Sequence, residues 1–233
     1  MKHLFLTLTA AAFMVSCGTE ATSENTTKKE PKKEEMSDKK DKTMAIGTVN
    51  PSLEAKLKDI SGTEMHIEEL GKKNGTLLIF SCNTCPFVVG NGEKSEGWEN
   101  RYNDLAAMAN EKEIGFALIN SNEAKRDGDD SFEEMVKHAK EAGYHGMNYL
   151  VDENHKVADA FNARKTPHVY LFNSENKLVY TGAIDDNVDR KAEVKENWLS
   201  DAMTSLAAGE EIAKPETKAS GCSIKRVKAE NKH

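Results

Sequence analysis

The chain has 233 residues, which is enough for one domain with a sizeable core and additional tails. Its net charge of −7 is mild and charges of both signs are mixed along it, which argues against a basic groove for nucleic acid. The mean hydropathy of −0.66 is low for a globular protein and indicates that part of the chain does not pack into a core.

Residues 1–17 have the pattern of an export signal. Lys2 and His3 precede an apolar stretch, 4–15, that is too short to span a bilayer and is typical of a secretory signal peptide. Ser16 and Cys17 at its end are similar to a bacterial lipobox. This resemblance implies a lipidated Cys17 and an exported lipoprotein of the cell envelope or periplasm, anchored to a membrane without spanning it. An ordinary signal peptide with an incidental cysteine is the alternative.

Residues 18–45 consist mainly of Thr, Ser, Glu and Lys, and include a charged run at 28–35. Such a composition buries little, so we expect a flexible tether that holds the domain on the order of 30 Å from the membrane. The folded domain is predicted at 46–209 and a C-terminal tail that contains Cys222 at 210–233.

A pair of cysteines follows the first strongly apolar segment of this domain. The run 75–79 reads as a buried strand, and Cys82-Asn83-Thr84-Cys85-Pro86 comes shortly after it. Pro86 fits the first turn of a helix, whose free N–H groups and dipole stabilise a thiolate. We therefore expect the pKa of Cys82 to lie below its usual value of about 8.5, with Cys85 placed to attack a mixed disulfide formed at Cys82.

Two structural interpretations of the pair compete with a redox role. The cysteines would either be structural or supply half of a zinc site. Zinc usually needs a second Cys pair or a His pair, and the sequence has neither at a suitable spacing. The sequence thus predicts a redox dithiol with no metal and no cofactor.

The other elements alternate between strands and helices. A hairpin is expected around Ser61–Thr63, a helix break at 90–92, a polar turn at 120–122 and a capping box at 131–134. The expected strands are 77–80, 114–119, 149–151, 168–172 and 177–180, and the expected helices start at 86, 131, 157 and 191, the last one ending at 207. This order predicts an α/β fold with a mixed central sheet and helices on both faces. Asp185 and Asp186 are expected in a solvated turn without a catalytic role.

The position of one proline gives the first resemblance. A CxxC that opens a helix, followed about eighty residues later by Thr166-Pro167 before a strand, resembles the thioredoxin fold. The resemblance implies that Pro167 is cis, that Thr166 and Pro167 face Cys82, and that the Thr166 backbone pairs with an incoming substrate chain. A trans proline before a strand is the alternative.

Several further motifs occur in the order seen in the peroxiredoxin-like redoxin family, a thioredoxin-superfamily branch related to alkyl hydroperoxide reductase/thiol-specific antioxidant proteins. The motifs are Cys82–Val88, Ile119–Asn122, Tyr149–Glu153, Leu178–Gly182 with Ile184–Asp186, and Gly221–Lys225. The chain lacks the Pro-x-x-x-Thr-x-x-Cys setting of a peroxidatic cysteine. It also has Ser81 and Asn83-Thr84 where classical thioredoxin has Trp and Gly-Pro.

The resemblance implies a membrane-tethered thiol–disulfide oxidoreductase. Cys82 and Cys85 would exchange disulfides with protein substrates, and a redox partner would reset the pair. Two alternatives stay open: a copper-binding metallochaperone of the same fold with His168 near the thiols, and a thiol peroxidase with Cys85 or Cys222 resolving. Cys222, left over in an oxidising compartment, is a candidate third redox thiol.

Overall fold

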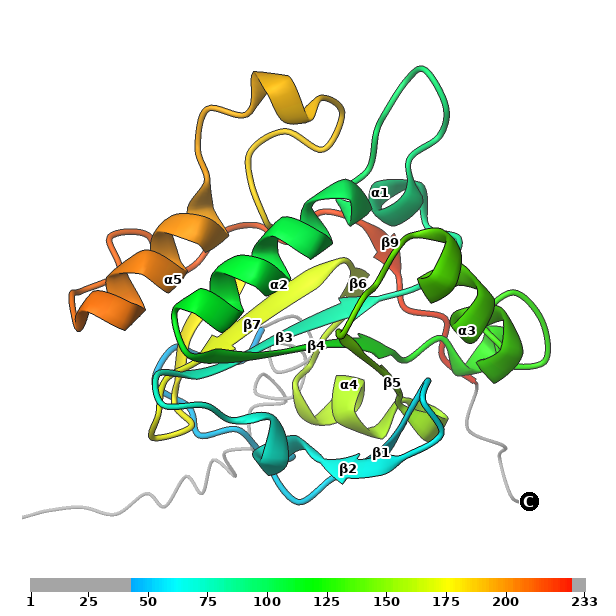
Figure 1. Cartoon of the computed structure of the whole chain (residues 1–233), viewed down its shortest axis with the longest axis horizontal. Coiled ribbons are helices and arrows are strands. Elements are labelled where there is room, and N and C mark those ends of the chain that lie inside the picture. Colours follow the sequence, from blue (N-terminus) through cyan, green and yellow to red (C-terminus); the bar gives the residue numbers. More distant parts are fainter. Residues whose placement is uncertain (1–42, 228–233) are drawn as a thin grey trace, which may run out of the picture. The chain divides into compact units, whose positions relative to one another are not determined.

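The computed structural model describes residues 43–227; the predicted signal peptide, Cys17 and most of the tether lie outside these residues. The central sheet has the order β2-β1-β5-β4-β3-β7-β8. Figure 1 shows it running through the middle of the domain. Its strands are β1 Lys56–Asp59, β2 Glu64–His66, β3 Gly75–Ser81, β4 Ile114–Asn120, β5 Asn148–Val151, β7 His168–Phe172 and β8 Leu178–Gly182.

The sheet is mixed, as the order of the elements predicts. Strands β3, β4 and β5 are parallel, whereas β7 runs antiparallel to both β3 and β8. The expected hairpin pairs β1 with β2, and β1 lies antiparallel to β5 on its other side. Strand β3 is buried at every position, and the cysteine pair begins directly after its carboxyl end.

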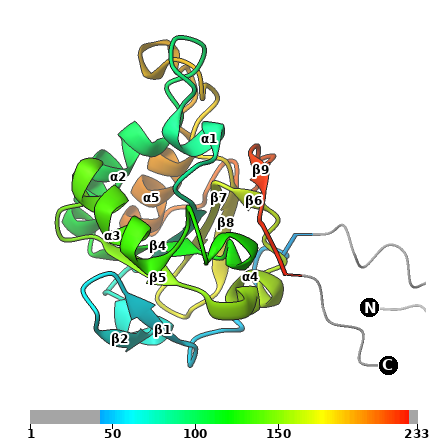
Figure 2. The same cartoon turned by 90° about the vertical axis from the view of Figure 1, so that its right-hand side faces the viewer.

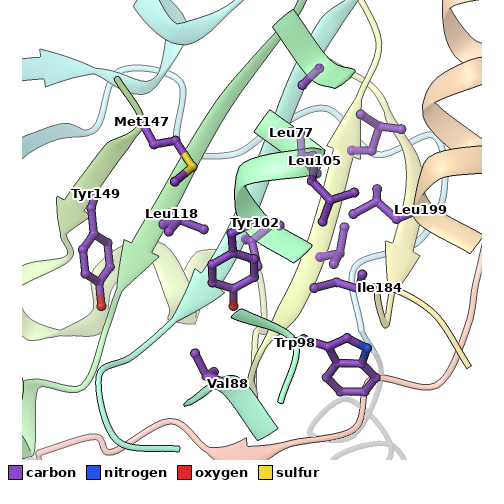
Figure 3. Close-up of a cluster of buried hydrophobic side chains, with 14 of the residues drawn as sticks. Leu77, Val88, Trp98, Tyr102, Leu105, Leu118, Met147, Tyr149, Ile184 and Leu199 are labelled. Atoms are coloured by element: carbon purple, nitrogen blue, oxygen red, sulfur yellow. The ribbon is translucent and has the colours of Figure 1, made fainter. Parts of the chain in front are cut away.

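Helices cover both faces of the sheet because the side chains of β3 alternate between two cores. Leu77 and Ile79 pack in one core with side chains of α1 Pro86–Val89, α2 Tyr102–Glu111, α3 Phe132–Glu141 and α5 Trp198–Ala208. Figure 3 shows part of this core, with Leu77, Leu105 and Leu199 gathered between sheet and helices. Leu78 and Phe80 pack in the other core with α4 Lys156–Ala160. Met44, expected in the tether, is buried in that second core.

The last helix begins later than its sequence pattern indicates. Residues Lys191–Glu193 form a separate 3₁₀ turn, and α5 starts only at Trp198. The reason is the carboxylate of Asp186, which accepts the backbone N–H groups of Lys195 and Glu196 at 2.9 and 3.2 Å and holds this segment outside the helix.

The neighbouring Asp185 is buried, so the expectation of a solvated turn is wrong for this residue. Its Oδ1 accepts the indole N–H of Trp98 at 2.6 Å, and its Oδ2 lies 3.2 Å from Nε of Arg101. Asp185 and Arg101 form an ion pair whose side chains are about 95% shielded from solvent. The pair ties the loop after β8 to the start of α2.

The tail after α5 returns across the sheet. The backbone around Glu216 pairs with Thr181 of β8, and β9 Cys222–Ser223 pairs antiparallel with β6 Lys165–Thr166. Figure 2 shows β9 beside β6 near α1. Among the helices of residues 43–227, none has the length and apolar character needed to cross a membrane.

Candidate dithiol site

The two cysteines lie in the connection from β3 to α1. Cys85 is the N-cap of α1, and Pro86 is its first residue, as the sequence predicts. The carbonyl of Cys85 accepts the N–H groups of Val88 and Val89 at 2.7 and 2.9 Å. Cys82 and Cys85 are only 2% and 3% exposed, and all three cysteines of the described residues are free thiols.

Thr166, which precedes Pro167, faces the pair. The peptide bond between them is cis, which confirms the expectation drawn from the resemblance. Cys82 Sγ lies 3.3 Å from Thr166 Oγ1, and Cys85 Sγ lies 3.1 Å from the Thr166 carbonyl oxygen. One residue therefore contacts both sulfurs, and it holds them on the same side of the loop.

A buried carboxylate fixes the loop between the cysteines. Asp130, which is fully buried, accepts the backbone N–H of Asn83 at 2.9 Å. It also accepts side-chain N–H groups of Asn120 at 2.7 Å and Asn122 at 3.0 Å. No sequence pattern points to Asp130 itself, although the polar turn at 120–122 that binds it follows a predicted strand.

Two buried tyrosines support the same loop. The hydroxyl of Tyr149 donates to Asn83 Oδ1 at 2.9 Å, and the hydroxyl of Tyr102 lies 3.0 Å from Ser81 Oγ. Figure 3 shows both hydroxyl groups pointing in the same direction. The residue before the pair and the residue within it are thus held by side chains from β5 and α2.

The surroundings of the two sulfurs separate their pKa values. The sulfur of Cys85 receives hydrogen bonds from the Cys82 thiol and from the thiol and N–H of Cys222, which together lower the pKa of Cys85 to about 5 despite its burial. Cys82 has the opposite shift. Its hydrogen bond to Cys85, its burial and the charge of Asp130 raise the pKa of Cys82 well above its ordinary value.

The expectation of a low pKa at Cys82 is therefore wrong. Its premise was that Cys82 faces the first turn of the helix. In the structure the helix begins at Pro86, so Cys85 is the residue at its N-terminus, and Cys82 instead lies beside Asp130.

Cys222 is brought to the pair, as the hypothesis of a third thiol requires. It is paired with Thr166 across β6 and β9, and its side chain packs against the core that contains Cys82 and Cys85. The backbone of Thr166, which the resemblance assigns to an incoming substrate chain, is thus paired here with the chain's own tail. Burial and the neighbouring Cys85 raise the pKa of Cys222 to about 11.

His168 contacts other groups than the thiols. Its ring nitrogens lie 3.3 Å from the Tyr170 hydroxyl and 3.4 Å from Thr181 Oγ1, and burial lowers the pKa of His168 to about 4. Within the part of the chain that the structure describes, no three His, Cys, Asp or Glu side chains are grouped to hold a metal ion. The histidine that the copper hypothesis adds to the thiols thus makes its hydrogen-bond contacts with other groups.

No protein-family model and no curated protein matches the chain. Among solved structures, an uncharacterized conserved protein from Geobacillus kaustophilus is 31% identical, with a TM-score of 0.70 over 79% of this chain and 94% of that one. The chain belongs to the same family as this protein. A hypothetical protein from Sinorhizobium meliloti 1021 is 26% identical, with a TM-score of 0.70 over 81% of this chain and 98% of that one.

A more distant similarity shows the fold. The peroxidoxin BcpB from Mycobacterium tuberculosis is 17% identical, with a TM-score of 0.51 over 71% of this chain and 97% of that one. The fold is thioredoxin-like, with the mixed sheet between helices that the sequence predicts.

The pKa of Cys85 is testable by following the ultraviolet absorbance of thiolates in the reduced protein. We expect one thiolate to form as the pH rises through about 5, and this transition to be absent in Cys85→Ser. Cys222→Ala should move it to higher pH because a thiol donor is lost, whereas Cys222→Ser keeps a donor and should move it less. No thiolate below about pH 8 in the wild type would contradict the assignment.

The role of Asp130 is testable by unfolding in urea. Asp130→Asn places an amide among three N–H donors, so we expect the free energy of unfolding to fall by about 1–3 kcal/mol. Loss of the charge should also lower the pKa of Cys82. Asp129→Asn is the matched control, since that side chain is 58% exposed and should change the stability little. Equal stability of the two variants would contradict the role of Asp130.

Proposed function

We propose that this protein is a thiol–disulfide oxidoreductase whose Cys82–Cys85 dithiol exchanges with disulfides of protein substrates. The observation that carries the proposal is a pair of buried free thiols at the start of α1, whose sulfurs lie 3.3 Å from the hydroxyl and 3.1 Å from the carbonyl oxygen of Thr166, the residue before a cis proline. Such a pair has a nucleophile and a second thiol placed to close the disulfide.

The electrostatics assign the two roles. We assign the nucleophile to Cys85, whose pKa is lowered to about 5, and the closing of the disulfide to Cys82, whose pKa is raised. This reverses the roles that the sequence suggests. When Cys85 forms a disulfide it no longer carries a negative charge, so its contribution to the raised pKa of Cys82 disappears, while that of Asp130 remains. Cys82 then becomes easier to deprotonate at the step that needs it.

The same chemistry runs in both directions. Reduced protein transfers two electrons to a disulfide and ends with a Cys82–Cys85 disulfide, and a redox partner with free thiols restores the dithiol. The reduction potentials of the substrate and of the partner decide the net direction.

We also propose that the domain acts at a membrane of the bacterial cell envelope, held there by acyl chains on Cys17. The support is the sequence of residues 1–17 and the charged tether that follows it. An envelope location suits the chemistry, since disulfides persist in oxidising compartments.

Catalysed reduction of a protein disulfide such as that of insulin, with dithiothreitol as the source of electrons, tests the oxidoreductase proposal. We expect the wild type to accelerate the reaction and Cys85→Ser to fall to the uncatalysed rate. Thr84→Ser is the matched control, because Thr84 lies within the same loop but is exposed, and it should keep most of the activity. A Cys85→Ser variant as active as the wild type would refute the proposal.

The anchor is tested separately by feeding cells a labelled fatty acid and fractionating them. The wild type should carry the label and sediment with membranes, and Cys17→Ser should carry no label. A labelled Cys17→Ser variant, or an unlabelled wild type, would exclude lipidation at this residue.

A further inference from the structure

The three thiols of the site differ in their access to solvent. Cys82 and Cys85 are almost completely buried, whereas Cys222 is partly exposed. Thiol–disulfide exchange requires the attacking sulfur to meet the disulfide in line, so a large substrate cannot reach a sulfur that is covered on all sides. Of these three residues, Cys222 is the one that is exposed to solvent to an appreciable extent.

Cys222 also lies beside the dithiol. Its backbone is paired with Thr166, whose carbonyl oxygen lies 3.1 Å from the sulfur of Cys85, and its side chain packs against the core that contains Cys82 and Cys85. This approach depends on Gly221, at which a Cβ would lie 2.2 Å from the carbonyl oxygen of Thr166. The glycine therefore lets the tail lie directly against the backbone beside the dithiol.

The segment that carries Cys222 is fixed on its C-terminal side. Ile224 is 5% exposed and packs in the second core, and its N–H donates to the carbonyl of Arg164 at 3.0 Å. The N–H of Lys225 donates to Asn122 Oδ1 at 2.8 Å, and Asn122 in turn binds Asp130. The tail and the cysteine loop are thus positioned by one hydrogen-bond network.

We propose that Cys222 is a transfer thiol, at which the external disulfide is attacked and from which the exchange passes inward to Cys85 and then to Cys82. This inference rests on the proposed function. It adds the path by which a bulky substrate exchanges its disulfide with a buried dithiol. It also gives strand β9, in the C-terminal tail, a role in the exchange reaction in addition to its role in packing.

The relay balances in three exchanges. Cys222 loses its proton to solvent and attacks an external disulfide R–S–S–R′ as a thiolate, and R′–S⁻ leaves and is protonated by solvent. Cys85 then attacks the sulfur of Cys222, forming a Cys85–Cys222 disulfide and releasing R–S⁻. Finally Cys82 gives its proton to R–S⁻ and attacks Cys85. The Cys82–Cys85 disulfide forms and the Cys222 thiolate leaves, to be reprotonated by water.

The middle disulfide can be trapped by removing the last thiol. We expect full-length Cys82→Ser, treated with oxidised glutathione, to accumulate a disulfide between tryptic peptides 74–94 and 219–225, which contain Cys85 and Cys222. In Cys85→Ser the glutathione should remain on Cys222, without a cross-link. A Cys82→Ser variant that carries glutathione on Cys85 and shows no cross-link would overturn the relay.

Rates with oxidised glutathione and with insulin give the second test. Cys222→Ser should still reach a Cys82–Cys85 disulfide at equilibrium, but at least about tenfold more slowly, most strongly with insulin. The control Cys222→Ser/Ser223→Cys keeps a thiol in the tail, but on the opposite, exposed face of the strand. We expect this variant to form the Cys82–Cys85 disulfide as slowly as Cys222→Ser. Wild-type rates in both variants would overturn the relay and leave the proposed function standing. If the wild type forms no Cys82–Cys85 disulfide, the proposed function fails, and the relay fails with it.

Discussion

The hydrogen bonds to the Asp130 carboxylate hold together the parts of the site that come from distant regions of the chain. A buried carboxylate is costly unless donors surround it, and here the Asn83 backbone and the side chains of Asn120 and Asn122 supply them. Asn83 belongs to the cysteine loop, Asn120 ends β4, and Asn122 binds the tail at Lys225. One buried charge thus sets the position of the loop relative to the sheet and of the tail relative to both.

The same charge shapes the chemistry. Asp130 lies close enough to disfavour a thiolate at Cys82, whereas Cys85 is surrounded by donors from Cys82 and Cys222. The negative charge of the dithiol therefore settles on the sulfur next to the helix and the tail, away from the carboxylate. The thiol nearest to solvent and the thiolate are consequently neighbours, which is the arrangement that an inward relay of disulfide exchange requires.

Local patterns predicted the scaffold well. The apolar run before the cysteines gave β3, Pro86 gave the start of α1, and the antiparallel pairing of β7 with β8 followed from the short turn between them. The cis bond before Pro167 came from a resemblance, since no local signal separates cis from trans proline. These features depend on residues close together in sequence or on a motif that recurs in a family.

The features that the sequence did not reveal depend on tertiary contacts. Asp130 lies in a polar loop, and only the fold brings it under the cysteine loop. Asp185 has the sequence surroundings of a solvated turn, yet Arg101 and Trp98 from another segment bury it. The order of the two cysteine pKa values also depends on which residue is the N-cap of α1 and on the position of the tail. Both are set by packing rather than by the spacing of the cysteines.

The central claim is that Cys82 and Cys85 form a reversible redox pair. Its most direct test is to equilibrate the protein in buffers of graded glutathione redox potential, quench the thiols and identify the state of each cysteine by mass spectrometry. The account predicts one reversible transition in which Cys82 and Cys85 become linked within the peptide 74–94. Cysteines that remain separate thiols across the whole range, or that only take up glutathione, would contradict it.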